Sequence, residues 1–251
     1  MVRERLSRLT SELTSQLEWM RVSQEITTLL LEGAEEEQAL QSIAARVRAI
    51  AEADTCLLIL PSVGGLWLCE IADGMVVFND RIRFPVRPMV GVIGTAPPGE
   101  GIGTLHPGPH GGNMDHNDVR VGARVHLPVF VPGALLSIGD VHASMGDGEI
   151  SITALEVAGE VRVRVDLEKG AALRRPWIDL PDSWITTGDG PTIADAIRVA
   201  AEEMARLLMG RLGLSADDAY MLLSIRGDAR VSQCAEPAVV AATARMVMPR
   251  L

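Results

Sequence analysis

The five histidines of this 251-residue chain all lie between residues 106 and 142, at His106, His110, His116, His126 and His142. Imidazole is both a common metal ligand and the usual acid or base near neutral pH, so this grouping predicts a reactive site. Acidic side chains that we expect to lack basic partners lie within this region or just after it: Asp115, Asp118, Asp140, Asp147 and Glu149.

Two glycine-rich segments hold most of these groups, residues 108–118 and residues 139–149. In the second segment, Asp140 and His142 are two residues apart, so on an extended chain they project to the same side. Asp147 and Glu149 repeat that spacing, and a turn at Gly146 would bring the four side chains together. Neither segment matches the HExxH, CxxC or EF-hand pattern, so the expectation of a metal rests on side-chain chemistry and not on a motif.

Short β-branched runs between turn residues predict the strands that position these segments. The expected strands are residues 90–93, 125–131, 135–138, 150–157, 161–167, 220–225 and 239–248. Strict alternation over Val161–Leu167 predicts a strand with one buried face. A long helix should follow Thr192, and a shorter one should begin at Ser215, which is a good N-cap.

Residues 1–74 have a different sequence pattern from the rest of the chain. Apolar residues recur at helical spacing over about the first 55 residues, and the runs Thr55–Leu60 and Leu66–Ile71 predict a hairpin. Helical periodicity ends near Met75, where glycine and proline become frequent. We therefore expect two domains, residues 1–74 and residues 75–251.

The composition excludes several functional classes. A formal charge of −10 argues against nucleic-acid binding, which needs Lys and Arg to displace counterions from phosphates. The apolar runs are far shorter than the roughly 20 residues that cross a bilayer. No secretory leader is evident at the N-terminus. Three widely spaced cysteines predict free thiols in a cytoplasmic protein.

Several long motifs in the second half resemble the acetamidase/formamidase family, in family order. They are Phe78-Asn-Asp-Arg-Ile-Arg-Phe-Pro-Val-Arg-Pro-Met-Val-Gly-Val-Ile-Gly94, Gly111-Gly-Asn-Met-Asp115, Leu127-Pro-Val-Phe-Val-Pro-Gly-Ala-Leu135, Gly139-Asp-Val-His-Ala-Ser-Met-Gly-Asp-Gly-Glu149, Asp217-Asp-Ala-Tyr220 and Gly227-Asp-Ala-Arg-Val-Ser-Gln233. Before them, residues ~18–74 resemble the opening of a GAF sensor domain.

The family resemblance implies an α+β fold that is mainly β. The expected body is sandwich-like or barrel-like, with one long and one short helix, preceded by a helical segment and a hairpin. It implies hydrolysis of short linear amides such as formamide and acetamide to carboxylate and ammonia, and a homo-oligomeric assembly. Residues 75–251 would correspond to the family domain without its N-terminal part.

The lead hypothesis is amide hydrolysis by a water that a divalent cation activates, with zinc as one candidate. We expect Asp115, His142 and Glu149 to bind the metal or activate water, with Asp140 and Asp147 completing the metal set. Asn113 is the candidate donor to the developing oxyanion, and Gly112, His110 and Gly139 are expected to border the substrate.

The remaining candidates have plainer interpretations. His126 is expected in a core or on the surface, His106 in a loop, and His116 on the opposite side of the chain from Asp115. No cysteine resembles a nucleophile, and no GxSxG motif supports a serine mechanism. Two other hypotheses stay open: a non-catalytic ligand-binding or regulatory module fused to the GAF-like segment, and a degenerate reading frame that folds poorly. Convergence of Asp115, His142 and Glu149 would distinguish the enzyme from both.

Overall fold

The computed structural model describes residues 55–60, 65–234 and 241–250, and contacts divide the chain into two compact units, residues 1–55 and 56–251. The helices expected in the first 54 residues lie outside the described residues. The expected domain boundary after Gly74 falls within a sheet of the second unit, between β2 (Gly65–Ala72) and β3 (Met75–Asn79). Where described, the chain contains no helix long and apolar enough to cross a bilayer.

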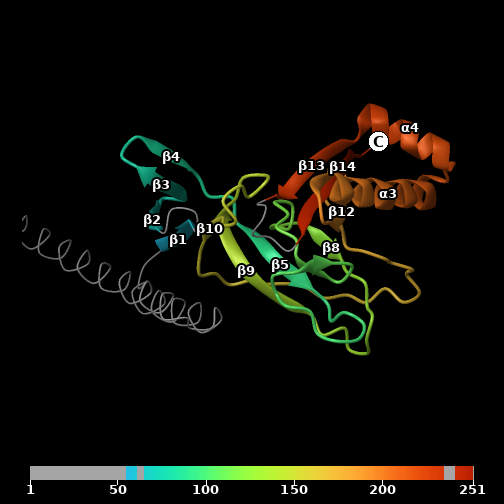
Figure 1. Ribbon diagram of the computed structural model, residues 1–251, viewed down its shortest axis with the longest axis horizontal. Coiled ribbons are helices and arrows are strands. Elements are labelled where there is room, and N and C mark those ends of the chain that lie inside the picture. The colour runs from blue at the N-terminus through green and yellow to red at the C-terminus, as the bar shows by residue number, and fades with distance from the viewer. Residues whose placement is uncertain (1–54, 61–64, 235–240, 251) are drawn as a thin grey trace, which may run out of the picture. The chain divides into compact units, whose positions relative to one another are not determined.

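Among the described residues, the larger sheet has nine strands in the order β4-β3-β2-β1-β10-β9-β5-β7-β6. Figure 1 labels β1 to β5, β9 and β10. Besides β2 and β3, the strands of this sheet are β1 (Thr55–Leu60), β4 (Ile82–Pro85), β5 (Met89–Gly94), β6 (Pro107–Gly108), β7 (Gly111–Asn113), β9 (Ser137–Ser144) and β10 (Leu155–Glu156). The expected hairpin thus contributes two strands of this sheet.

The smaller sheet has five antiparallel strands in the order β13-β14-β12-β11-β8. They are β8 (Arg124–His126), β11 (Trp177–Asp179), β12 (Ser183–Gly190), β13 (Asp228–Gln233) and β14 (Ala242–Pro249). Both strand orders are open, so the described residues form a sandwich-like α+β fold and not a closed barrel.

Side chains alternate between the two faces of the smaller sheet, as the pleat requires. Ile178, Ile185 and Val247 face the larger sheet, where they pack with Ile93 and Met114. Their neighbours on the opposite face pack with the helices: Trp177, Trp184, Met246 and Met248. The smaller sheet is therefore buried on both sides, in a three-layer arrangement.

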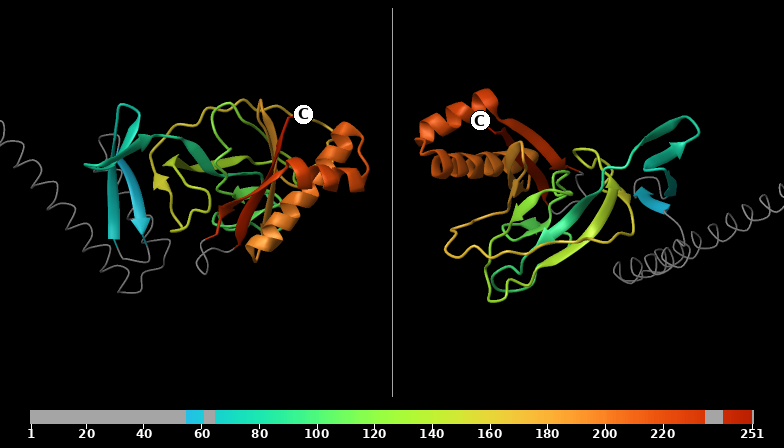
Figure 2. Two further views of the ribbon diagram at one scale, coloured as in Figure 1. Left: turned by 90° about the horizontal axis from the view of Figure 1, so that it is seen from above. Right: turned by 180° about the vertical axis from the view of Figure 1, so that it is seen from behind.

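The long helix α3 (Ile193–Leu212) covers the outer face of β12 and β14 (Figure 2). It begins as expected: the Thr192 side chain accepts a hydrogen bond from the Asp195 amide. Gly188 lets it lie close to β12, because a Cβ at that position would sit 2.1 Å from the Ala196 carbonyl oxygen.

The helix α4 (Ala216–Arg226) begins at Ser215, as predicted. The expected strand over residues 220–225 is wrong, because these residues continue this helix, with Ala219 and Leu223 buried against α3 and β14. The last strand, β14, pairs instead with β12 and β13. The spacing of apolar residues over 220–225 is compatible with either a strand or a helix. The Ser215 N-cap and the acidic residues of the first turn favour the helix.

The expected strand over residues 161–167 is also wrong. These residues form no strand, and all of them are exposed, including Val165 at 71%. The alternation was real, but a strand also needs a neighbour to accept its backbone hydrogen bonds.

Candidate functional site

The two predicted glycine-rich segments lie together beside β5, at the junction of the two sheets. Asp115, Asp140 and His142 each offer a ligand atom, and these atoms all lie within 4.8 Å of one another. His142, Glu149 and Glu156 form a second such group. The structure therefore brings together four predicted residues and adds Glu156, which we did not predict.

The strands of the larger sheet place three of these side chains. His142 on β9 is directly opposite Glu156 on β10 and Met89 on β5. Its Nε2 atom lies 3.2 Å from Asp140 Oδ1 and 3.3 Å from Glu156 Oε1. His142 is 1% exposed, whereas the side chains of Asp140 and Glu156 are 33% and 30% exposed, so the buried imidazole meets carboxylates that reach solvent.

Gly91 on β5 makes room for the cluster. A Cβ at this position would lie 2.5 Å from Asp115 Oδ1 and 2.5 Å from Asp140 Oδ2. The Gly91 carbonyl also accepts hydrogen bonds from the amides of Met114 and Asp115, each at 3.2 Å. Glycine at this position thus allows both carboxylates to approach one point above the strand.

Gln233, at the end of β13, links the two segments from the smaller sheet. Its Nε2 donates to Asp115 Oδ2 at 2.8 Å and to Glu149 Oε2 at 2.7 Å. Backbone bonds align it there, because the Gly148 amide donates to the Ser232 carbonyl and the Cys234 amide donates to the Gly148 carbonyl. Gln233 lay within a motif that resembles the family, but its contacts are too distant in sequence to be foreseen.

Three cluster residues have backbone conformations that are unusual for residues other than glycine. Asp115, Asp140 and Glu149 have φ angles of +48°, +60° and +40°, in the left-handed region that non-glycine residues rarely adopt. Each such residue costs about 1–3 kcal/mol and persists only where the surroundings impose it, often at functional sites.

The pKa values of the cluster residues are shifted because several carboxyl groups surround one imidazole. Burial raises the pKa of Asp115 well above its usual range, and the charges of Glu149 and Asp140 add to this. Burial also raises the pKa of Glu156 to about 8, although His142 opposes it. Burial alone would lower the pKa of His142, but the hydrogen bond to Asp140 and the charges of Glu156, Asp140 and Asp115 raise it to about 9. The cluster therefore retains protons at neutral pH.

These residues suit a divalent cation. Asp115 Oδ1 and His142 Nδ1 are buried without a hydrogen-bond partner among the described residues. A buried acceptor in that state costs about 1–3 kcal/mol, which a cation would recover. Asp115, Asp140, His142, Glu149 and Glu156 are the groups that could hold it.

Asp147 lies elsewhere, and this corrects the expected metal set. Both of its oxygens accept hydrogen bonds from the Arg245 guanidinium, at 2.8 and 2.9 Å, and Asn117 donates to it at 2.8 Å. Arg245 also binds Asp118 at 2.8 Å, so two carboxylates that we expected to be unpaired share a basic partner. The partner was hidden because it is about a hundred residues away in sequence.

The expected substrate-contacting residues are near the cluster along the strands. Asn113, Val92 and Gly139 form one row across β7, β5 and β9, and Gly91 and Asp140 are the adjacent residues. Gly112 lies opposite Ile93 in the next row. Among the described residues, no hydrogen bond joins the Asn113 side chain to the cluster, so its role as an oxyanion donor stays a prediction.

The other histidines are apart from the cluster. His110 packs on Gly112, where a Cβ would lie 2.8 Å from its Nε2. His116 is fully buried, and neither ring nitrogen has a partner in the described part of the chain. His126 stacks on Trp177 with ring centroids 3.9 Å apart, in keeping with the expectation of a packing role.

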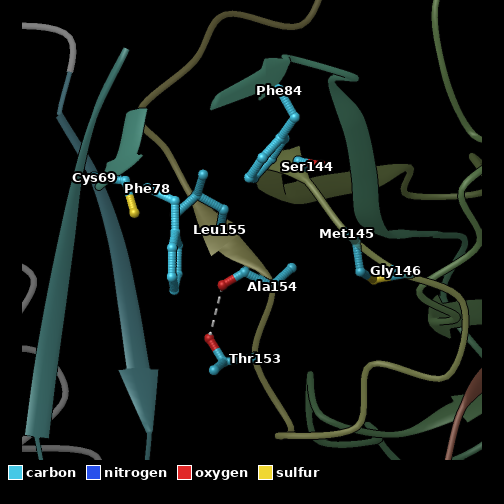
Figure 3. Close-up of a pocket in the computed structure, with 9 residues that line it drawn as sticks. All are labelled: Cys69, Phe78, Phe84, Ser144, Met145, Gly146, Thr153, Ala154 and Leu155. Atoms are coloured by element: carbon cyan, nitrogen blue, oxygen red, sulfur yellow. Dashed lines mark hydrogen bonds between the residues drawn. The ribbon is translucent and has the colours of Figure 1, made fainter. Parts of the chain in front are cut away.

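A hollow of about 210 Å³ is lined in part by residues that follow His142 and residues that precede Glu156 in the chain (Figure 3). It lies between the β2–β4 strands and β10, and apolar side chains provide most of its wall: Cys69, Phe78, Phe84, Met145, Ala154 and Leu155, with Ser144, Gly146 and Thr153. Two of these wall residues contact the cluster directly. The Thr153 hydroxyl and the Ala154 amide both donate to Glu156 Oε1, at 3.4 and 3.3 Å. One carboxylate therefore connects the hollow with His142.

Comparison with known proteins gives consistent matches. The chain is 47% identical over 72 residues to an acetamidase from Mycolicibacterium smegmatis and 46% identical over 71 residues to a formamidase from Methylophilus methylotrophus. These stretches cover 28% of this chain but only 18% and 17% of those relatives.

Solved structures match over a longer region. An acetamidase from Bacillus halodurans is 40% identical with a TM-score of 0.73, over 78% of this chain and 69% of that one. A predicted acetamidase/formamidase from Thermoanaerobacter tengcongensis is 39% identical with a TM-score of 0.73, over 78% and 68%. Residues 98–249, which include all five residues of the cluster, match the Acetamidase/Formamidase family. The chain therefore belongs to the acetamidase/formamidase family.

Proposed function

We propose that this chain hydrolyses short linear amides, such as formamide and acetamide, to a carboxylate and ammonia. The observation that carries the proposal is the cluster of four carboxylates around the buried His142, with an orphaned oxygen on the buried Asp115. Relatives named acetamidase and formamidase support the substrate class. A non-catalytic ligand-binding module is not favoured, because such a module has no need of a strained acid cluster that retains protons at neutral pH.

Hydrolysis of an amide needs an activated water and a proton for the departing nitrogen. A bound divalent cation, held by Asp115, Asp140, His142 and Glu149, would acidify water and polarise the amide carbonyl. Glu156 lies between the hollow and His142, so its carboxyl group is placed to hold a proton for the leaving nitrogen. Gln233 keeps Asp115 and Glu149 at a fixed separation. Strands β9 and β10 position Asp140, His142 and Glu156.

The hollow beside Glu156 is the proposed place for the acyl part of the amide. Its apolar wall suits an alkyl group, while the amide would face Glu156. Each buried methylene contributes about 0.8 kcal/mol, so turnover should depend on chain length until the space is filled.

The identity of the metal is part of the proposal. One imidazole among carboxylates is compatible with zinc, but carboxylates also suit manganese and calcium. Cytoplasmic location, a homo-oligomer and the GAF-like character of residues ~18–74 remain predictions from the sequence.

The test is ammonia release by the full chain from formamide and acetamide, after chelation and after addition of zinc, manganese or calcium. We expect turnover that the chelator abolishes and one of these metals restores. Asp115→Asn should remove it, whereas Asp228→Asn, the same change at an exposed position of β13, should not. Absence of ammonia release with every metal would contradict the proposed activity, and turnover unaffected by the chelator would contradict the metal.

A further inference from the structure

Thr243 is a buried residue of β14 that lies directly opposite Gln233 of β13. A bulge between Val231 and Gln233 produces this pairing, because without it Ser232 would be the residue opposite Thr243. Residues directly opposite each other in an antiparallel pair point to the same face of a sheet. Bulges are frequent next to active sites, where they redirect a side chain. Here both side chains donate hydrogen bonds to residues 108–118.

The Thr243 hydroxyl donates to the Met114 carbonyl oxygen at 2.9 Å, although the two residues are 129 positions apart. The other polar group of the same peptide unit, the Asp115 amide, donates to the Gly91 carbonyl of β5 at 3.2 Å. The smaller sheet therefore binds one side of the Met114–Asp115 peptide and the larger sheet binds the other. Because a peptide unit is planar, these two bonds fix the plane that precedes Asp115.

The orientation of this plane matters because Asp115 has a left-handed φ of +48°. This angle is the rotation about the bond between the peptide nitrogen and the Cα atom, so plane and angle together set the direction of the side chain. A backbone that relaxed to an ordinary negative φ would turn the carboxylate away from Asp140 and His142. Such conformations persist only where the surroundings impose them.

We propose that Thr243 is a positioning residue: its hydroxyl holds the Met114–Asp115 peptide in the orientation that delivers the Asp115 carboxylate to the cluster around His142. Gln233 holds the carboxylate itself, by donating to Asp115 Oδ2 at 2.8 Å. Two cross-strand neighbours thus fix one acid, one through its backbone and one through its side chain. The consequence for metal binding rests on the proposed function, whereas the hold on the peptide does not.

Another threonine of the smaller sheet provides a matched control. Thr186 on β12 is buried like Thr243, and its hydroxyl donates to the Ala200 carbonyl of α3 at 2.7 Å. It is directly opposite Trp177, on the face of the sheet that packs with the helices and not on the face of the cluster. Loss of this hydroxyl removes the same kind of bond without affecting Asp115.

The first experiment is amide hydrogen exchange, measured by mass spectrometry on the full chain without added metal. Thr243→Val keeps the shape of the side chain and removes the donor, whereas Thr243→Ser keeps the donor. We expect exchange around Asp115 to be about tenfold faster in Thr243→Val, because a buried carbonyl loses its donor, and close to wild type in Thr243→Ser and Thr186→Val. Exchange around Asp115 equal to wild type, or raised equally in α3, would overturn the positioning role.

The second experiment is calorimetric titration of the metal-free proteins with zinc, manganese and calcium. Residues that orient metal ligands commonly contribute 10- to 100-fold in affinity, so Thr243→Val should bind the metal more weakly by about this factor. Thr243→Ser and Thr186→Val should bind it nearly as wild type does. Equal affinity of Thr243→Val and wild type, or equal loss in Thr243→Ser, would contradict the role of the hydroxyl in metal binding.

The two experiments separate this inference from the proposed function. If wild-type protein binds none of the three metals, the metal of the proposed function is wrong. The exchange of the Asp115 amide still decides whether Thr243 positions this residue.

Discussion

Arg245 on β14 binds both carboxylate oxygens of Asp147, at 2.8 and 2.9 Å, although the two residues are 98 positions apart. Arg245 is 2% exposed and also donates to Asp118 and to the Ser232 hydroxyl. Asp147 is two residues before Glu149. The guanidinium therefore fixes, from the smaller sheet, the loop that delivers Glu149 to the cluster.

Arg245→Met should lower both stability and activity. Removing one partner of a buried ion pair typically costs about 3–5 kcal/mol, and here part of the loss is recovered because Asp147 is 43% exposed. We expect a lower free energy of unfolding in urea titrations and a fall in kcat/KM as Glu149 loses its position. Arg230→Met, at an exposed ion pair of β13, is the control. A fully active Arg245→Met protein would show that the loop holds Glu149 without this contact.

Gly91→Ala should abolish activity while the fold survives. The new Cβ would lie 2.5 Å from two carboxylate oxygens, so Asp115 and Asp140 could no longer approach each other. We expect a loss of at least about a hundredfold in kcat/KM, since small displacements of reacting groups have effects of this size. Gly210→Ala, a helix position with no atom within 4 Å of the added Cβ, should keep wild-type kinetics.

Gln233→Glu should weaken metal binding more than stability. The change keeps the shape of the side chain but replaces the donor between Asp115 and Glu149 with a third acid. Outer partners of metal ligands commonly contribute 10- to 100-fold in affinity, so we expect a loss of about that size in calorimetric titration with the activating metal. Affinity equal to wild type would mean that Gln233 does not hold these carboxylates for a cation.

Ala154→Leu should change substrate preference. Ala154 lines the hollow beside Glu156, and a larger side chain there would occupy the space proposed for the acyl group. A methylene in an apolar pocket is worth about 1–3 kcal/mol, so kcat/KM for butyramide relative to acetamide should fall about tenfold or more. The ratio is the readout because partial unfolding lowers both values equally. An unchanged ratio would place the acyl group elsewhere.

The buried His116 should lower the free energy of unfolding as the pH falls below about 6.5. Complete burial lowers the pKa of His116 from its usual 6.5 to about 3, and the charge of Arg245 adds to this. The unfolded chain takes up a proton below about pH 6.5, whereas the folded chain does not until about pH 3. The contribution of His116 is thus complete above pH 6.5 and is lost as the pH falls, by about 1.4 kcal/mol per unit.

The measurement is urea unfolding of wild type and His116→Gln at several pH values. The difference in free energy of unfolding should shift in favour of the variant as the pH falls from 6.5 towards 4. Carboxylates contribute to the pH dependence of both proteins and cancel in the difference. A difference that stays constant with pH would mean that His116 is protonated in the folded protein.

The sequence alone determined the features that depend on local chemistry. Helix α3 could be predicted because its apolar period and its Thr192 cap are written in consecutive residues. Asp115, Asp140, His142 and Glu149 could be selected because reactive side chains between glycines stand out in a short segment. Strand β5 was predictable for the same reason, as a short apolar run between turns.

Only the tertiary structure decided which side chains lie together in the cluster around His142. Glu156 joins the cluster through cross-strand pairing with His142, Gln233 joins it from the other sheet, and Arg245 removes Asp147 from it. Residues 161–167 have a strand pattern but no strand, because pairing is a property of two segments and not of one. Local patterns report what a segment can do, whereas hydrogen bonds between distant residues depend on how the sheets pack.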